Sequence, residues 1–167
     1  MLADETGRRY AVAFVGSDVT ERRRREELSH LQASTDPLTG VANRRVVFEV
    51  LQEHLAAARG RGCGLLFCDV DRFKQVNDEH GHAAGDQLLV ALAGRLGELA
   101  GPGDVVARLG GDEFVLLSPG SDQDSLTSLA ERLDACMRAP VQTSAGALAL
   151  RVSVGSALGR PGRTPTT

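Results

Sequence analysis

The sequence predicts an α+β fold in which helices flank a central, mostly antiparallel sheet. Residues 63–68 are almost entirely apolar, which is typical of a strand buried on both faces. Apolar stripes of helical period occur in 43–58 and 83–99, and the Gly-Gly pair at 110–111 lies between two apolar segments, as in a tight hairpin. From residue 36 onward the predicted order is helix, strand, helix, strand, strand, helix, strand, which such a sheet accommodates.

Composition excludes several classes of protein. The 167 residues suffice for one compact domain, and 42% hydrophobic and 25% charged residues are ordinary for a soluble globular protein. A net charge of −3, the absence of Trp and the scarcity of aromatic residues argue against nucleic-acid binding. No apolar segment approaches the length of a membrane span, and no signal peptide is found. Cys63, Cys68 and Cys136 lack metal-like spacing, so we expect reduced thiols and a cytoplasmic protein.

Residues 8–19 are expected to form one extended strand, in which Tyr10, Val12 and Phe14 alternate with smaller residues. A single strand is not stable alone, and we identify no sheet partner for it. We therefore expect residues 1–20 to be the end of a domain whose body lies upstream.

A helix is expected at residues 21–34, within a linking segment at 21–35. Its four consecutive arginines, Arg22 to Arg25, could contact phosphates. The two glutamates that follow favour instead a solvated signalling or coiled-coil helix, with Leu28 and Leu31 at its seam.

The Asp36-Pro37 pair ends that helix, because the residue before a proline disfavours helical backbone. A polar turn at 36–45 leads into a helix from Asn43 to about Ala58. The later elements, in chain order, are a strand at 63–68 that ends in Asp69-Val70-Asp71, a short helix or turn at 72–80, a helix at 83–99, a hairpin at 104–118, a helix at 122–138 and a last strand at Ala147–Ser156.

Two carboxylates lie on the turn of the predicted hairpin. Gly110 and Gly111 have no side chains, so another molecule can approach the backbone there. Asp112 and Glu113 place oxygen ligands beside that gap. Alone, the pattern is weak and more often marks only an ordinary turn with solvated acids, so its meaning depends on partners elsewhere in the chain.

Asp69 and Asp71 are the first candidate partners. Side chains alternate along a strand, so both acids point to the same face where a buried strand reaches solvent. Such a pair suits Mg²⁺, which takes few oxygen ligands from protein and the rest from phosphates and water. The alternative is that these acids cap the helix that follows.

The segment after this strand is rich in polar residues and glycine. They are Lys74, Asn77, Asp78, His80, Gly81, His82, Gly85 and Asp86. Guanine presents an N1–H and an amino donor beside an O6 acceptor; Asp accepts from these donors, and Asn can donate as well as accept. Backbone N–H groups around 72–74, with the Lys74 ammonium, could hold phosphates. Zinc at His80 and His82 is a weaker alternative, since no cysteine accompanies them.

These motifs together closely resemble the GGDEF family, the diguanylate cyclases, over residues 34–158. Four motifs occur in the order and spacing of that family, namely DPLTGVANRR at 36–45, DVDRFKQVND at 69–78, GHAAGD at 81–86 and RLGGDEF at 108–114. The resemblance implies a fold related to polymerase palms and class III nucleotide cyclases.

The resemblance also implies a reaction in bacterial second-messenger signalling. Two domains, each holding one GTP, face each other and convert the two GTP into cyclic di-GMP and two pyrophosphates. Positioning and charge stabilisation carry such phosphoryl chemistry. The implied cofactor is Mg²⁺, with Mn²⁺ as a substitute.

Residue roles follow from the same resemblance. Asp69, Asp112 and the Val70 carbonyl are implied as metal ligands, with Asp112 also as the proton acceptor and Lys74 as a charge stabiliser. The implied substrate contacts are Asn77 and Asp86 at the guanine, His82, the backbone of Arg72 and Phe73, the Gly110–Gly111 turn and Glu113. Asp71, Asp78 and Glu79 are expected to be capping or supporting acids.

The N-terminal part resembles the last strand of a PAS sensor domain and its signalling helix. That arrangement implies a homodimer, formed through the helix and the facing active sites, and regulation by an upstream sensor domain.

The chain departs from the family at its product site. Many members carry an inhibitory Arg-x-x-Asp motif before the Gly-Gly pair, whereas this chain has Gly101-Pro102-Gly103-Asp104. Glycine cannot clamp a phosphate or guanine as arginine does, so we expect no strong product inhibition.

A second departure is at the C-terminus. Members usually continue into a helix that supplies a Lys and an Arg to the phosphates, and PGRTPTT does not resemble it. We expect a domain at 36–160 without this helix, with exposed apolar surface, weakened GTP binding and a disordered tail at 161–167. The alternative function is therefore a catalytically impaired module that binds GTP or dimerises in a regulatory role.

Overall fold

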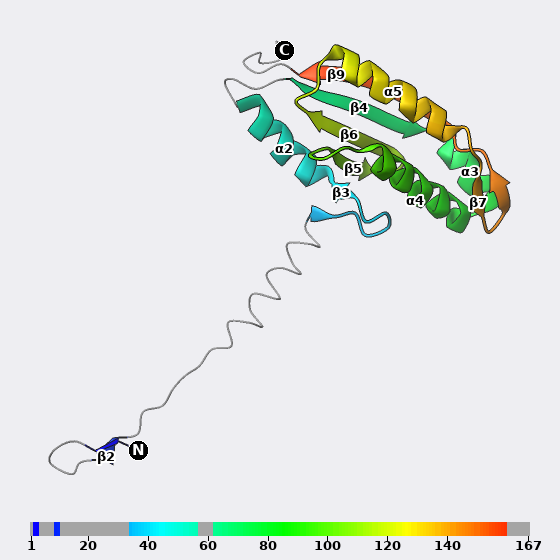
Figure 1. The fold of residues 1–167 in the computed structure, drawn as a ribbon. Helices are drawn as coiled ribbons and strands as arrows, with labels where there is room; N and C mark the ends of the chain where they lie inside the picture. Colours follow the sequence, from blue (N-terminus) through cyan, green and yellow to red (C-terminus); the bar gives the residue numbers. More distant parts are fainter. Residues whose placement is uncertain (1, 4–8, 11–33, 57–61, 160–167) are drawn as a thin grey trace. The chain divides into compact units, whose positions relative to one another are not determined.

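The structure is a computed structural model that describes residues 2–3, 9–10, 34–56 and 62–159 (Figure 1). The chain divides into two compact units, Met1–Leu31 and Gln32–Thr167. Nearly all of the predicted helix at 21–34, most of the predicted strand at 8–19 and the tail at 161–167 lie outside the described residues.

In the first unit, β1 (Leu2–Ala3) pairs with β2 (Arg9–Tyr10) in an antiparallel arrangement. The expectation that the N-terminal strand has no partner in this chain is therefore wrong for Arg9–Tyr10. Leu2–Ala3 supplies the partner.

The second unit is built on a five-stranded sheet. In spatial order its strands are β3 (Ala42–Asn43), β5 (Val105–Gly110), β6 (Glu113–Pro119), β4 (Cys63–Val70) and β9 (Val152–Gly159). The β3–β5 pair is parallel and the other three pairs are antiparallel. The predicted α+β class, with a mostly antiparallel central sheet, is confirmed.

Helices cover both faces of this sheet (Figure 1). On one face, α4 (His82–Leu99) and α5 (Gln123–Met137) pack on Leu66, Cys68 and Val70 of β4. On the other face, α2 (Arg44–Ala56) packs through Val47 on β5 and β6, and Leu65 and Phe67 of β4 adjoin that cluster. Alternate residues of β4 thus enter two hydrophobic clusters, which explains its continuous apolar sequence.

Short elements complete the unit. The helix α3 (Phe73–His80) follows β4, and a small hairpin of β7 (Val141–Thr143) and β8 (Gly146–Leu148) lies between α5 and β9. No helix in the described part of the chain is long and apolar enough to cross a membrane.

The predicted last strand at Ala147–Ser156 is wrong in its extent. Residues 147–148 belong to β8, residues 152–156 begin β9, and the three residues between them belong to neither strand. Leu150 is 2% exposed, and the Asp71 N–H donates to the Arg151 carbonyl at 3.0 Å. This connection turns the chain from the small hairpin onto the edge of the main sheet, a change that the continuous alternating sequence did not reveal.

Candidate functional site

The Asp69–Val70 end of β4 lies beside the turn that joins β5 and β6. Asp69 is the partner of Glu113 in the β4–β6 ladder, and the Val70 N–H donates to the Asp112 carbonyl at 3.3 Å. Gly110 and Gly111 have φ values of 147° and 53°, which favour glycine. The structure therefore places the two acids that the sequence assigned to one metal site at the same end of the sheet.

Like charges converge at this strand end. Burial raises the pKa of Asp69 above its usual value, and the carboxylates of Asp112 and Asp71 raise that pKa further. A cation bound here would relieve the repulsion between these carboxylates.

The donor set fits Mg²⁺. Within the described residues, no group of three or more His, Cys, Asp or Glu side chains could hold a metal by itself. Mg²⁺ at a nucleotide site needs only one or two carboxylates and takes its other oxygens from phosphates and water. Asp69, Asp112 and the Val70 carbonyl suffice for such a site.

Asp71 does not cap α3, contrary to one expectation. Its Oδ1 accepts a hydrogen bond from the Ser153 hydroxyl at 2.6 Å, which ties it to β9. The N-cap residue is Arg72, in a left-handed conformation with φ of 57°, and it makes no side-chain cap. The Asp71 side chain therefore links the end of β4 to β9 and does not stabilise the start of α3.

The start of α3 has no side-chain cap. The first N–H groups of a helix have no partner within the helix, and none is capped by the Arg72 side chain. Asp69 precedes these groups by only a few residues. A phosphate carried by a metal at Asp69 could accept hydrogen bonds from the backbone of Phe73 and Lys74.

Asn77 packs tightly between α3 and α4. Its Oδ1 is buried and has no hydrogen-bond partner within the described residues. A Cβ built on Gly85 would collide with this oxygen and lie 3.2 Å from Phe73 Cε2. A buried acceptor without a partner is costly to the fold.

The other candidate side chains are exposed. The side chains of Lys74, His82, Asp86 and Glu113 make no hydrogen bond or ion pair within the described part of the chain, so each is available to a ligand. Asp86 follows Gly85 directly on α4, close to Asn77. The structure shows no contact that joins His82 to this pair.

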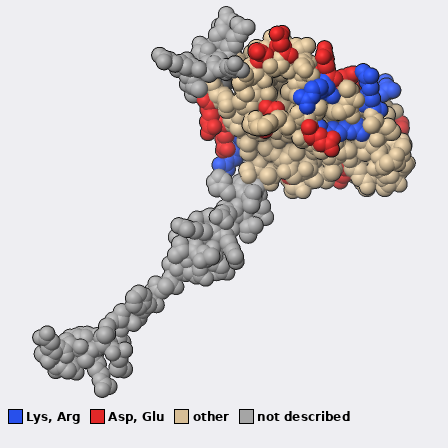
Figure 2. All heavy atoms as spheres, in the orientation of Figure 1, with Lys and Arg blue, Asp and Glu red and all other residues tan. Residues whose placement is uncertain are grey.

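A cavity of about 680 Å³ opens on a different face of α3 from Asn77. Its lining residues are Asp69, Asp71, Arg72, Gln75, Val76, Glu79, Ala149 and Arg151. Figure 2 shows basic and acidic side chains side by side over the end of the domain that carries α3 and the end of α5. Arg151 was missed by the sequence reasoning, which placed it within a continuous strand, and no sequence signal marks it.

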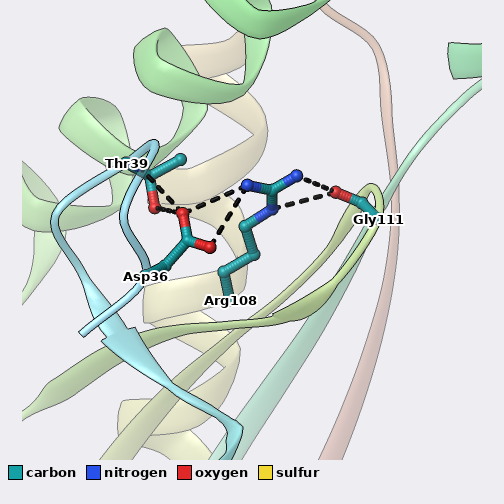
Figure 3. A network of polar contacts seen from close by, with 4 residues as sticks. All are labelled: Asp36, Thr39, Arg108 and Gly111. Carbon is teal, nitrogen blue, oxygen red and sulfur yellow. Dashed lines mark hydrogen bonds and ion pairs between the residues drawn. The ribbon is translucent and has the colours of Figure 1, made fainter. Parts of the chain in front are cut away.

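Arg108 is a second residue that the sequence reasoning missed as a functional candidate. It lies within the RLGGDEF motif, but its contacts are with Asp36 and with the carbonyl of Gly111 (Figure 3). The position of Arg108 next to the Gly-Gly turn was the available signal.

The cysteines take no part in this site. All three are free, and burial raises the pKa of Cys68 to about 12, with Cys136 nearby adding to the shift. The expected reduced thiols are present, and Cys68 is unreactive at neutral pH.

Residues 33–167 match the family described as "Diguanylate cyclase, GGDEF domain". Diguanylate cyclase DgcM of Escherichia coli is 44% identical over 120 residues, covering 70% of this chain and 29% of DgcM. Cyclic di-GMP phosphodiesterase PdeR of E. coli is 35% identical over 143 residues, covering 86% of this chain and 22% of PdeR.

The fold has a close structural counterpart. The coiled coil and GGDEF domain of DgcB from Caulobacter crescentus, solved in complex with c-di-GMP, superposes with a TM-score of 0.81 at 29% identity. The match covers 88% of this chain and 80% of that one. By contrast, the chain spans less than a third of the lengths of DgcM and PdeR.

Proposed function

Because the chain belongs to the GGDEF domain family, we propose that it is a diguanylate cyclase of bacterial second-messenger signalling, which condenses two GTP into cyclic di-GMP and two pyrophosphates. One observation carries the proposal. The Gly110–Gly111 turn is intact, and Asp112 is hydrogen-bonded through its backbone to Val70, beside Asp69.

Asp69, Asp112 and the Val70 carbonyl would hold Mg²⁺, or Mn²⁺ in its place. When bound, the ion would neutralise phosphate charge and favour ionisation of the attacking hydroxyl. The Asp112 carboxylate would accept the proton of the 3′-hydroxyl. Each 3′-oxygen then forms a bond to the α-phosphorus of the other GTP, and the bond from that phosphorus to the pyrophosphate breaks.

The nucleotide would lie between the hairpin and α3. Asn77 and Asp86 would accept from the guanine amino and N1–H groups, while His82 and Glu113 would flank the substrate. Lys74 and the first N–H groups of α3 would hold phosphates, which favours turnover because charge develops there in the transition state. Gly110 and Gly111 leave the hairpin backbone open to the nucleotide.

Arg151 adds a positively charged side chain to the site, and it is not among the residues implied by the resemblance to the family. It lines the same cavity as Asp69 and Arg72, and its guanidinium has no hydrogen bond or ion pair within the described residues. Guanidinium groups bind phosphate oxygens in bidentate fashion. Arg151 would therefore hold the pyrophosphate portion of GTP.

The reaction requires two copies of the domain. We propose a homodimer in which residues 36–160 form the cyclase domain, residues 21–35 form a signalling helix, and residues 1–20 end a PAS-like sensor. Each copy would present one GTP to the other.

A second candidate function is a GTP-binding or dimerising regulatory module without cyclase activity. The similarity to PdeR, which is named as a phosphodiesterase of cyclic di-GMP, favours it. Similar sequences thus occur in proteins named for opposite activities.

Incubation with GTP and Mg²⁺, followed by chromatography of the nucleotides, separates the two functions. The enzyme is expected to form cyclic di-GMP, and Asp112→Ala is expected to form none. Glu131→Gln, an exposed carboxylate change on α5, is the matched control and should keep activity. GTP binding without product, at protein concentrations that support dimers, would favour the regulatory module.

A further inference from the structure

Arg108 joins two turns that lie far apart in the sequence (Figure 3). Its Nη1 donates to Asp36 Oδ1 at 3.1 Å and Oδ2 at 3.3 Å, across 72 residues of chain. Its Nε and Nη2 both donate to the Gly111 carbonyl, at 2.9 and 2.7 Å. One planar guanidinium therefore fixes the distance between the turn at residues 36–41 and the Gly-Gly turn.

The turn at residues 36–41 is rigid without help from Arg108. The Asp36 N–H donates to the Val41 carbonyl at 2.8 Å, and the Gly40 N–H donates to the Asp36 carbonyl at 2.9 Å. Asp36 Oδ1 also accepts from the Thr39 N–H at 2.9 Å and the Thr39 hydroxyl at 2.6 Å. The Asp36 carboxylate is thus held in place and can serve as a fixed anchor for a cation.

The Gly-Gly turn, in contrast, contains little that would fix it. Glycine is the residue with the greatest backbone freedom, and two occur in succession here. The β5–β6 register shifts between Arg108 and Gly110, so regular pairing is interrupted immediately before the turn that Gly110 and Glu113 close. The Arg108 guanidinium supplies the missing constraint by binding the Gly111 carbonyl with two N–H groups.

This constraint acts next to the proposed proton acceptor. The Gly111 carbonyl belongs to the peptide that precedes Asp112, and the Asp112 carbonyl, in the peptide that follows, accepts from Val70 at 3.3 Å. Arg108 and Val70 therefore hold the backbone on both sides of Asp112. The side chain between these two peptides is that of Asp112, which is proposed to bind the metal and to accept the proton.

We propose that Arg108 is a positioning residue for catalysis, anchored by Asp36, which sets the position of Asp112 relative to Asp69. The inference rests on the proposed cyclase function. Arg108 does not act on the substrate itself, because its side chain is only 13% exposed and all four of its guanidinium hydrogen bonds are made to Asp36 and Gly111. A movement of the segment that carries Asp36 would therefore shift Asp112, through the contacts of Arg108 with Asp36 and with the Gly111 carbonyl.

The first test compares Arg108→Lys with the wild-type chain. Lysine keeps the charge that pairs with Asp36, but its single ammonium cannot reproduce the planar fork that also binds Gly111. We expect kcat to fall about tenfold or more while KM for GTP changes by less than about twofold, since the polar groups proposed to bind guanine and phosphates, on Asn77, Asp86 and Lys74, lie on α3 and α4 and not on the hairpin. Arg45→Met, which breaks the exposed Arg45–Glu49 pair on α2, is the control and should keep both constants.

The second test asks whether Asp36 acts through Arg108. Asp36→Asn alone should lower kcat, and it should add little to the loss in the Arg108→Lys background, because residues in one network are not additive. Full additivity of the two losses would overturn the anchoring role of Asp36.

A readout without catalysis separates this inference from the cyclase proposal. Hydrogen exchange of the Val70 amide, followed by NMR, reports on its bond to Asp112. Arg108→Lys should speed this exchange, while amides of α5 keep their rates, and this holds whether or not the chain forms cyclic di-GMP. Unchanged Val70 exchange, or an unchanged kcat in an active Arg108→Lys protein, would overturn the proposal. A wild-type chain that forms no product contradicts the cyclase function alone.

Discussion

Gly85 provides a sharp test of the nucleotide site, because a single methyl group at this position would reach Asn77. A Cβ on residue 85 would collide with Asn77 Oδ1 and lie 3.0 Å from Asn77 Cγ and 3.2 Å from Phe73 Cε2. Gly85 is buried on α4, so the added atom cannot turn toward solvent. The Asn77 side chain must therefore leave its position in the Gly85→Ala variant.

Two effects follow from this displacement. Overpacking at a buried site destabilises a protein by about 1–3 kcal/mol. Loss of the proposed Asn77 hydrogen bonds to guanine, at about 0.5–1.5 kcal/mol each, should raise KM or Kd for GTP about tenfold.

Gly94→Ala is the matched control. Gly94 lies on the same helix, and a Cβ there would meet nothing within 4 Å. Alanine at an exposed helical position should stabilise the fold by about 0.5–1 kcal/mol relative to glycine. It should leave GTP affinity unchanged.

Isothermal titration of GTP and chemical unfolding, measured on both variants, check these expectations. A Gly85→Ala protein that binds GTP as tightly as the wild type, while Gly94→Ala behaves as expected, would refute the assignment of Asn77 to the guanine. A loss of stability without any loss of affinity would have the same meaning.

Three further predictions concern charge and regulation. The raised pKa of Asp69 means that the folded state binds this proton more tightly than the unfolded state, so Asp69 makes the metal-free fold less stable as pH rises through that pKa. Asp69→Asn should therefore raise the Tm of the metal-free protein at neutral pH and abolish the further rise in Tm on adding Mg²⁺. A lower Tm of the metal-free variant would contradict this. Arg151→Ala should raise KM for GTP about tenfold in steady-state assays, through the loss of a charged contact to phosphate. An unchanged KM would exclude that contact. Added cyclic di-GMP should not inhibit turnover potently, because the Asp104 carboxylate accepts from the Gly101 N–H at 2.8 Å and glycine stands where the product site needs arginine; potent noncompetitive inhibition would overturn this expectation.

The central features of the fold were predictable from local patterns. The apolar segment before Asp69 and the Gly-Gly pair before Asp112 are each encoded by neighbouring residues. Their pairing brings Asp69 opposite Glu113, as expected for a hairpin beside a central strand. The α+β class therefore followed from periodicity and turn chemistry alone.

Long-range contacts were not predictable in the same way. The Asp36–Arg108 ion pair joins residues 72 positions apart, and the local sequence around either residue does not predict the contact. The packing of Asn77 on Gly85 depends on how α3 meets α4. The β7–β8 hairpin was missed because the alternating sequence that contains Arg151 runs through two different strands.

The stoichiometry and concentration dependence of the reaction with GTP and Mg²⁺ test the proposed cyclase function most directly. We expect one cyclic di-GMP and two pyrophosphates for every two GTP consumed. We also expect a rate per chain that rises with protein concentration, because two GTP-loaded domains must meet, and a loss of both products in Asp112→Ala. Absence of cyclic di-GMP at concentrations where the chain is dimeric and binds GTP would contradict the proposed function.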